Sequence, residues 1–241
     1  MSLKEVDSTN NFLKNILSNS KPVPEGTVIM AEDQFAGRGQ RENVWYAEPG
    51  KNLTFSILLK PNFVDARMQF DVTRVASLGV YDALSPLLGN QLSIKWPNDI
   101  YYGDKKLGGM LIENILQGSQ IKNSVVGIGL NVNQNNFPDT AGNATSVTQI
   151  LHKDYELKNL LAEICNHIER YYLSLKAGSV DFVRNTYLSR LYRLNEAKRY
   201  ESNGEVFTGT IRGVTDNGLL IIDHADGQKH FSLKELVFLK D

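Results

Sequence analysis

Three short polar motifs combine the residue types that a site for an anionic ligand needs. The first lies in residues 31–45 and contains Gly37, Arg38, Gly39, Gln40 and Arg41. Glycine lets the backbone approach a ligand and offer its N–H groups, and arginine presents a planar fork of donors to a carboxylate or phosphate. This loop suits anion binding, although a solvated surface loop with two ordinary charges would explain the same residues.

The second motif is Lys95-Trp96-Pro97-Asn98-Asp99, which stands where an apolar run ends. Lysine can balance the charge of a phosphate, and Asp99 can hold a hydrated Mg²⁺ that the phosphates also bind. A simpler interpretation is a strand that ends at Pro97, with Asn98 and Asp99 in its turn.

The third motif places Lys105 and Lys106 before the pair Gly108-Gly109 inside an apolar run. Glycine within a strand usually marks a bulge or the close approach of another group. We interpret Lys105 as a solvent-facing turn residue, which leaves Lys106 as the candidate functional lysine.

Asn131 follows a further strand pattern that contains alternating glycines, Gly127 and Gly129. Its carboxamide both donates and accepts, so it could read the edge of an adenine. It could equally cap the turn after a tightly packed strand, and the residues alone leave both interpretations open.

Charge and motif content exclude several classes of protein. Lys and Arg number 26 against 27 Asp and Glu, so no overall field would hold a nucleic acid or an anionic membrane. The four histidines lack metal-ligand spacing, and the patterns G-x-S-x-G, G-x-x-x-x-G-K-[ST] and H-E-x-x-H do not occur. The single cysteine, Cys165, falls in an amphipathic helical pattern. We therefore expect catalysis by orientation and charge neutralisation, without a covalent enzyme intermediate.

The cysteine content and the N-terminal residues indicate the cellular compartment. One cysteine cannot form an internal disulfide, and the chain shows no signal-like start and no run of about 18 apolar residues. We expect a cytoplasmic protein with no membrane partner.

The spacing of apolar residues predicts the elements that must position the motifs. Helices are expected from Ser8 or Thr9 to before Lys21, from Asp65 to about Pro86, over 157–175 and over 180–192. Strands are expected over 26–32 and 53–59, and three or four mostly antiparallel strands over 92–132. After Lys198, the turn pairs Asn203-Gly204, Asn217-Gly218 and Asp226-Gly227 separate short strands that resemble a small β-barrel.

Taken in order along the chain, these motifs closely resemble those of the biotin protein ligases. The resemblance rests on Ser8-Thr9-Asn10, on Gln34 with Gly37-Arg38-Gly39, on Lys95-Trp96-Pro97-Asn98-Asp99, on Lys106-Leu107-Gly108-Gly109 and on Gly127-Ile128-Gly129-Leu130-Asn131. It implies an α+β fold: a mixed β-sheet flanked by helices, like the class II synthetases, in residues 1–194, and a small SH3-like β-barrel in residues 195–241.

The resemblance also implies an activity. Biotin would be activated by ATP, with Mg²⁺, to biotinyl-5′-AMP and then transferred to a lysine of a biotin carboxyl carrier protein. Only seven residues precede Ser8, so we expect no N-terminal DNA-binding domain and no DNA partner. A homodimer remains open.

Matched position by position, the resemblance implies roles for individual residues. The biotin pocket would be formed by Ser8, Thr9, Asn10, Gln34, Gly37, Arg38, Gly39, Gln40, Lys106 and Gly109. Lys106 and Arg38 would be catalytic. ATP would contact Arg41, Trp45, Lys95, Asn98, Asp99 and Asn131, with Asp99 as the candidate ligand for Mg²⁺. Glu42 stands where the family often has glycine, and its carboxylate would repel phosphate.

Three other interpretations compete with this one. A lipoate or octanoyl protein ligase shares the general fold, but those proteins lack the K-W-P-N-D motif. A binding module without catalysis would sense biotin or nucleotide, yet it would not need both Lys106 and Asp99. An SH3-like peptide-binding protein would explain only the C-terminal residues.

Overall fold

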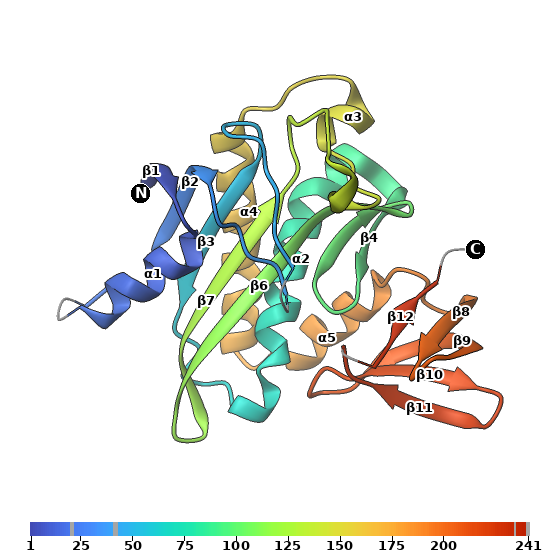
Figure 1. Cartoon of the computed structure of the whole chain (residues 1–241). Coiled ribbons are helices and arrows are strands. Elements are labelled where there is room, and N and C mark those ends of the chain that lie inside the picture. The colour runs from blue at the N-terminus through green and yellow to red at the C-terminus, as the bar shows by residue number, and fades with distance from the viewer. Residues whose placement is uncertain (20–21, 41–42, 234, 240–241) are drawn as a thin grey trace.

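A seven-stranded sheet forms the centre of the N-terminal part of the chain (Figure 1), and the three polar motifs lie in its strands or in the segments that join them. The computed structural model describes residues 1–19, 22–40, 43–233 and 235–239. The strands, in sheet order, are β1 (Ser2–Val6), β2 (Val28–Gln34), β3 (Leu53–Leu59), β7 (Gln120–Leu130), β6 (Lys105–Gln117), β5 (Asp99–Tyr102) and β4 (Leu92–Lys95). β1 pairs parallel to β2 and every other pair is antiparallel, which makes the sheet mixed.

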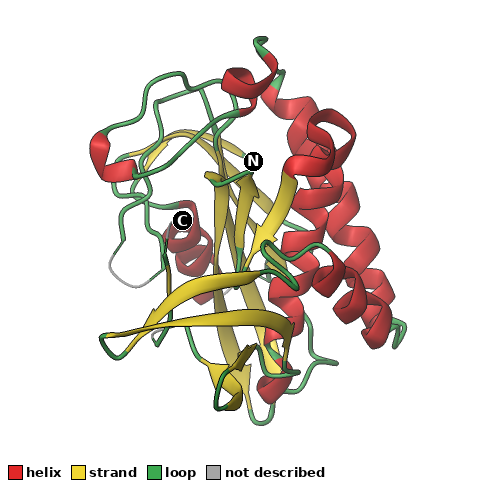
Figure 2. Ribbon diagram, turned by 90° about the vertical axis from the view of Figure 1, so that its right-hand side faces the viewer, coloured by secondary structure: helices red, strands yellow, loops and turns green. Residues whose placement is uncertain are grey.

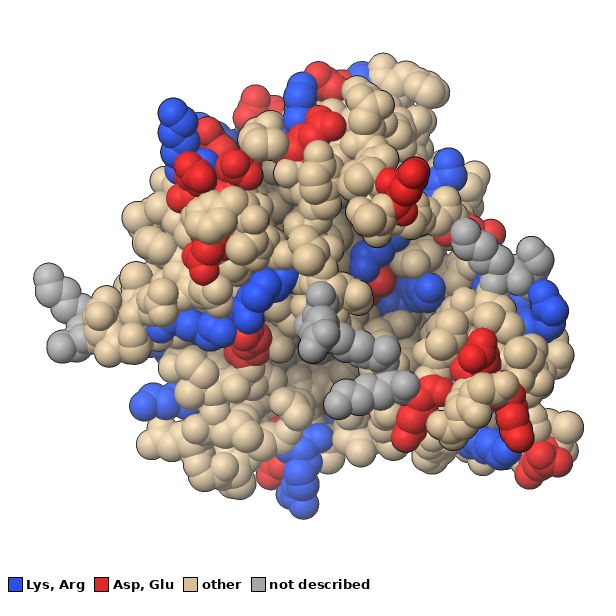
Figure 3. All heavy atoms as spheres, viewed as in Figure 1, with Lys and Arg blue, Asp and Glu red and all other residues tan. Residues whose placement is uncertain are grey.

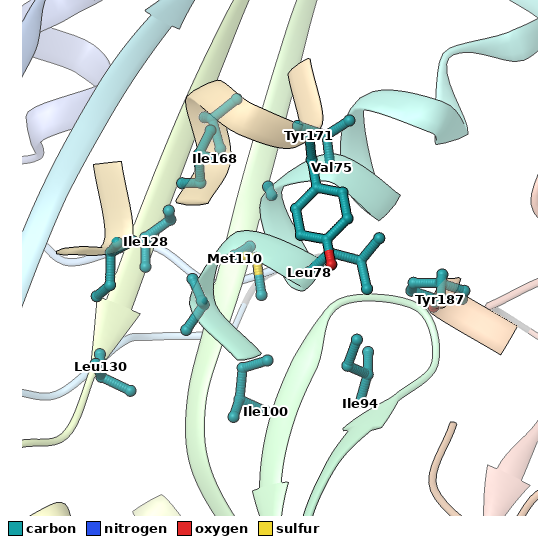
Figure 4. Packing of buried hydrophobic residues seen from close by; sticks show 14 of the residues in the cluster. Val75, Leu78, Ile94, Ile100, Met110, Ile128, Leu130, Ile168, Tyr171 and Tyr187 are labelled. Carbon is teal, nitrogen blue, oxygen red and sulfur yellow. The ribbon is translucent and has the colours of Figure 1, made fainter. Parts of the chain in front are cut away.

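Two long helices cover one face of this sheet. α2 (Phe70–Leu88) and α4 (Leu157–Lys176) lie side by side there (Figures 1 and 2), and α5 (Val180–Ser189) packs against both. Alternate residues of β3, such as Phe55 and Ile57, point toward these helices and are buried. Figure 4 shows how Val75 and Leu78 of α2 meet Ile168 and Tyr171 of α4 above strand residues. This is the main hydrophobic core.

The opposite face of the sheet is covered only in part, by α1 (Thr9–Ser18). A second, smaller cluster of buried side chains lies beneath this helix, formed by Leu13, Ile29, Leu58 and Val125. Leu58 and Ser56 share this face because side chains of a strand alternate. The part of the face beyond α1 is left for the site.

The C-terminal residues form a separate five-stranded antiparallel sheet. Its strands, in sheet order, are β11 (Gly227–Phe231), β10 (Leu220–His224), β9 (Glu205–Val214), β8 (Ala197–Ser202) and β12 (Val237–Phe238). The predicted turn pairs do separate β8 from β9, β9 from β10 and β10 from β11. Gly204, Gly218 and Gly227 all have positive φ, which these turns require and glycine adopts without strain.

A buried ionic network fastens this small sheet to α2 and α5. The guanidinium of Arg74, 1% exposed, donates to Asp71 Oδ1 at 2.6 Å and to the carbonyls of Thr215 and Asp216 at 2.6 and 3.1 Å. Arg184 bridges Asp71 and Asp216 at 2.9 and 2.6 Å. Because a buried charge is costly unless it is paired, each member of the network depends on the others.

The predicted fold class is confirmed: a mixed sheet flanked by helices, with a small antiparallel sheet after it. Four strands occupy 92–132, within the expected range. Three elements were not predicted, namely β1, the five-residue helix α3 (Val147–Leu151) and the last strand, β12, which no predicted turn pair precedes. The helix expected from Asp65 begins as a 3-10 turn, η1 (Ala66–Met68), before α2, and α5 ends at Ser189 instead of continuing to 192. Further 3-10 turns are η2 (Gly89–Gln91) and η3 (Asp139–Ala141).

None of the helices in the described residues is long and apolar enough to cross a membrane.

We predict that Arg74→Met lowers the free energy of unfolding by about 2–4 kcal/mol, because it leaves two carbonyls without their donor and removes one of the two cations that pair with the buried carboxylate of Asp71. Urea unfolding, monitored by circular dichroism, measures this free energy and the midpoint concentration of urea. Arg67→Met is the matched control: its side chain also pairs with an aspartate, Asp65, but is 83% exposed, so the midpoint should stay unchanged. Equal midpoints for both variants would contradict the assigned importance of the network.

Candidate functional site

A cavity of about 480 Å³ opens on the sheet face that α1 leaves free. Figure 3 shows the hollow between the large and the small sheet, with basic side chains gathered in it. The predicted site residues that line it are Ser8, Thr9, Asn10, Gln34, Arg38, Gly39, Gln40, Trp45, Lys95, Asn98, Asp99, Lys106 and Gly109. The chain fold therefore brings thirteen positions from four separate segments to one cavity.

Three glycines form the floor of this cavity and explain why the motifs contain them. Gly109 lies opposite Gly129 across the β6–β7 pair, and Gly127 lies opposite Leu111. A Cβ at Gly127 would overlap the carboxamide of Asn10, and one at Gly129 would overlap the indole of Trp45. A Cβ at Gly109 would stand 2.8 Å from Asp99 Oδ1. Each glycine thus makes room for one functional side chain.

One end of the cavity is a compact group of neutral polar side chains. Gln34 Oε1 accepts from the backbone N–H of Thr9 at 2.7 Å and from its hydroxyl at 3.0 Å. The hydroxyl of Ser56, fully buried on β3, lies 2.6 Å from Asn10 Oδ1 and 2.7 Å from Thr9 Oγ1. Hydroxyl and amide groups held in this way can pair with a neutral ligand that both donates and accepts.

A carboxylate that the sequence motifs did not include, Glu113 of β6, borders this end. It accepts from Asn10 Nδ2 at 2.8 Å, from Lys14 Nζ at 2.6 Å and from Arg38 Nη2 at 2.8 Å. These hydrogen bonds and positive charges hold the pKa of the Glu113 carboxyl below its usual range, although partial burial acts in the opposite direction. Arg38 is therefore tied to β6, a strand that also supplies cavity residues such as Lys106 and Gly109.

The other end holds an ion pair between Lys106 and Asp99. Lys106 Nζ lies 2.8 Å from Asp99 Oδ1, and both side chains are about a third exposed or less. β5 and β6 pair so that Asp99 stands opposite Gly109, with a register shift just beyond Ile100. The sequence pattern predicted that another group approaches the Gly108-Gly109 pair closely. That group is the Lys106–Asp99 ion pair, which lies over Gly109.

Lys95 enters the same end from the last position of β4. Its ammonium lies 4.7 Å from the ring centre of Tyr101 and 4.8 Å from that of Phe238, so it rests between two aromatic faces. Burial lowers the pKa of Lys95, while nearby Asp99 raises it to a lesser extent. A partly dehydrated cation of this kind interacts more strongly with a phosphate than an exposed lysine does.

The segment between Lys95 and Asp99 is held by hydrogen bonds from three directions. Trp96 Nε1 donates to the carbonyl of Gly218 in the small sheet at 2.9 Å. The Tyr187 hydroxyl of α5 donates to the Pro97 carbonyl at 2.8 Å, and Asn98 Nδ2 donates to the Met110 carbonyl. Asn98 thus lines the cavity with its carboxamide already bonded to β6.

The remaining predicted residues lie in different places. Trp45 covers Gly129, and its buried Nε1 has no hydrogen-bond partner among the described residues. Gly37 and Asn131 do not line the cavity. Asn131 Nδ2 donates to the Thr145 carbonyl at 3.0 Å, and its buried Oδ1 has no partner in the part of the chain that the structure describes. Arg41 and Glu42 lie outside the described residues.

Sequence reasoning missed Ser56, Glu113 and the C-terminal residues that complete the cavity, Leu233, Leu236, Val237 and Phe238. Ser56 stands inside the largely apolar run 53–59, and Glu113 directly follows the apolar run 110–112; this signal could have identified them. Phe238 carries no such signal, because its approach to Lys95 depends on how the two sheets dock.

Two alternative chemistries receive no support from the described residues. They contain no group of three or more His, Cys, Asp or Glu side chains that could hold a metal ion. Cys165 lies on α4, away from the cavity, and burial raises the pKa of its thiol to about 11. Such a thiol is a poor nucleophile at neutral pH.

The arrangement suits the joining of a carboxylate to a phosphate. Neutral hydrogen-bonding groups occupy one end, and two lysines and a carboxylate occupy the other, within one cavity. Fixed cations can orient two anionic reactants against each other and stabilise the charge that builds up between them.

Comparison with known proteins gives the family. Residues 3–131 match the model of the biotin/lipoate A/B protein ligase family, and residues 199–233 match that of the biotin protein ligase C terminal domain. The chain is 28% identical to the biotin--[acetyl-CoA-carboxylase] ligase of Paracoccus denitrificans, over 98% of this chain and 99% of that one. It is also 28% identical to the bifunctional ligase/repressor BirA of Bacillus subtilis, over 93% of this chain and 69% of that protein.

A solved structure matches the whole chain as well. The biotin protein ligase of Aquifex aeolicus, in complex with biotin and ATP, superposes with a TM-score of 0.82 at 30% identity. The match covers 100% of this chain and 98% of that one. The chain belongs to the biotin/lipoate A/B protein ligase family and, by its two matched segments together, to the biotin protein ligases.

Proposed function

We propose that this chain is an ATP-dependent biotin protein ligase that forms biotinyl-5′-AMP and transfers biotin to a lysine of a biotin carboxyl carrier protein. One observation carries the proposal: a single cavity joins the neutral polar group at Thr9, Asn10 and Gln34 to the cationic group at Lys95 and Lys106. The first group has the donors and acceptors for the ureido ring of biotin, and the second has the charge for the phosphates of ATP.

In the first half-reaction, the carboxylate oxygen of biotin attacks the α-phosphorus of ATP, and the bond to pyrophosphate breaks. Lys106 is the residue best placed to neutralise the carboxylate and the oxygen that comes to bridge carbon and phosphorus. Arg38 would hold the same anionic region from the loop side. Ser8, Gly39, Gln40 and Gly109 would complete the biotin pocket, since all four line the cavity. The assignment of Gly37 rests on the sequence motif alone.

The nucleotide would lie at the other end. Lys95 and Asn98 would meet the phosphates, and Trp45 would cover the intermediate from the loop. Asp99 is the carboxylate in the cavity able to meet a Mg²⁺ that arrives with ATP, which would draw it away from Lys106. Asn131 would read adenine through its buried Oδ1, which has no partner among the described residues, because its Nδ2 already donates to the Thr145 carbonyl. Arg41 keeps its predicted role in binding ATP.

In the second half-reaction, the amine of the carrier lysine attacks the acyl carbon of biotinyl-5′-AMP, and AMP leaves. The acceptor must therefore reach the mouth of the cavity, beside the loop that carries Arg38. A homodimer, a cytoplasmic location and the boundary between residues 194 and 195 remain predictions of the sequence.

The first test is ATP–pyrophosphate exchange with biotin, with lipoate or with no acid added. We expect exchange that depends on biotin, because the first half-reaction is reversible and needs no acceptor protein. Exchange with lipoate and not biotin would assign the chain to the lipoate branch of its family. A folded protein that exchanges with neither acid would contradict adenylation and favour a sensor.

Lys106→Ala should slow biotin-dependent exchange by about a hundredfold, since loss of a charge-assisted hydrogen bond at the reacting atoms costs roughly 1.5–3 kcal/mol. The matched control is Lys105→Ala, which removes the neighbouring lysine, an exposed residue outside the cavity. Unchanged turnover in Lys106→Ala would remove this residue from the mechanism.

Gly127→Ala should raise KM for biotin by about tenfold and leave KM for ATP nearly unchanged, because the added methyl displaces Asn10 at the cost of overpacking. Gly213→Ala is the control, since a Cβ there meets Ile221 at an ordinary 3.5 Å. Steady-state exchange kinetics measure both constants. An equal rise in the two KM values would argue against a biotin-specific role for the Asn10 end.

A further inference from the structure

Glu113 stands where two separately positioned parts of the site meet. Its Oε2 accepts from Asn10 Nδ2, on α1, and from Arg38 Nη2, on the loop after β2. Its Oε1 accepts from Lys14 Nζ, one helical turn beyond Asn10. A single carboxylate on β6 therefore joins the helix to the loop.

The cluster pairs one carboxylate with two cations, of which Arg38 lines the cavity and also interacts electrostatically with Asp7. Two cations, Lys14 and Arg38, share one carboxylate, and the Glu113 side chain is only 26% exposed. Hydrogen bonds and neighbouring charges keep the pKa of Glu113 low, so the carboxylate is ionised at neutral pH. Within the described part of the chain, the Arg38 side chain donates to Glu113 through Nη2, and the other donors of its fork can meet an anionic ligand.

The hydrogen bonds of Asn10 show why its orientation needs Glu113. Its Oδ1 lies 2.6 Å from the Ser56 hydroxyl, and its Nδ2 is shared between the Leu111 carbonyl and Glu113 Oε2, at 3.1 and 2.8 Å. Asn10 is 3% exposed, so a carboxamide that turned over would leave buried polar atoms unpaired. The carboxylate at Glu113 can only accept, which fixes the amide nitrogen on its side.

Arg38 in turn anchors a folded loop. The backbone N–H of Gly39 donates to the Asn43 carbonyl at 2.7 Å, and that of Trp45 donates to the Gly37 carbonyl at 2.9 Å. Arg38 and Val44 form a bridge between these bonds. The contact between Arg38 and Glu113 therefore ties the paired residues 37–40 and 43–45, the Arg38 hairpin, to the sheet.

We propose that Glu113 is a positioning residue for biotin binding, which orients the carboxamide of Asn10 and holds the Arg38 hairpin at the mouth of the cavity. The inference rests on the proposed function, because it assigns Asn10 and Arg38 to the biotin pocket. The opposing model is that Glu113 competes with the ligand carboxylate for Arg38, in which case its removal would strengthen binding.

Steady-state exchange kinetics of Glu113→Gln separate the two models. The glutamine side chain has the same size as glutamate, but its NH₂ group is a donor and faces Asn10 Nδ2, Lys14 Nζ and Arg38 Nη2, which are also donors. We expect KM for biotin to rise about five- to tenfold and KM for ATP to stay unchanged. This rise is the size expected when charge-assisted hydrogen bonds between partly exposed groups are lost. An unchanged or lower KM for biotin would overturn the proposal, and so would an equal rise in both constants.

Asp82→Asn is the matched control. Asp82 is also a partly buried carboxylate that pairs with two cations, Arg170 and Arg190, but these partners do not line the cavity, whereas Asn10 and Arg38, the partners of Glu113, do. It should leave KM for biotin unchanged, whatever its effect on stability. If Glu113→Gln does not fold, Glu113→Asp, which keeps the charge but shortens the reach by one methylene, takes its place in the same assays.

A second measurement tests the anchor independently of the reaction. Trypsin should cleave the ligand-free Glu113→Gln protein after Arg38 several times faster than the unsubstituted protein, with the site located by mass spectrometry and Asp82→Asn unchanged. Equal cleavage rates would refute the anchoring of the hairpin even if exchange activity were absent. Absence of biotin-dependent exchange in the unsubstituted protein would instead refute the proposed function, so the two failures are distinguishable.

Discussion

The site depends on three glycines in neighbouring strands, because their missing Cβ atoms let functional side chains approach the strand backbone closely. Gly109, Gly127 and Gly129 lie together on β6 and β7, and each provides the space that Asp99, Asn10 or Trp45 occupies. A well-packed sheet face would normally fill this space with apolar side chains. Because the floor is bare backbone, polar groups from α1, from the loop and from β5 can surround a ligand-sized volume while the sheet stays continuous.

The other elements explain why that floor can remain open without loss of the fold. The large core lies on the opposite face, under α2 and α4, so the stability of the sheet does not rely on the cavity side. The small sheet closes the cationic end: Gly218 accepts from Trp96, and Phe238 lies against Lys95. Arg74 and Asp71 tie the same turn to α2. Docking of the small sheet is thus part of the geometry at Lys95.

Much of this could be predicted from local patterns, and what could not has physical causes. The apolar periodicity of 53–59 and 157–175 and the glycine turns after residue 198 specify their elements directly. β1 was missed because it is an edge strand whose residues, including Lys4 and Glu5, are largely exposed, and α3 is too short to show a period. The motifs predicted which residues belong to the site. They could not predict that Asp99 pairs with Lys106 over Gly109, because that contact depends on the register between β5 and β6. The position of Phe238 depends on docking between sheets, which no local pattern encodes.

The central claim is that biotin and ATP lie side by side in this one cavity, with the biotin ring at Asn10 and the phosphates at Lys95 and Lys106. A crystal structure with biotin and a non-hydrolysable ATP analogue tests it most directly. The account predicts both ligands over Gly109, Gly127 and Gly129, with the biotin carboxylate within hydrogen-bond reach of Lys106. Either ligand bound outside the cavity, or the two bound with their carboxylate and α-phosphate apart, would contradict it.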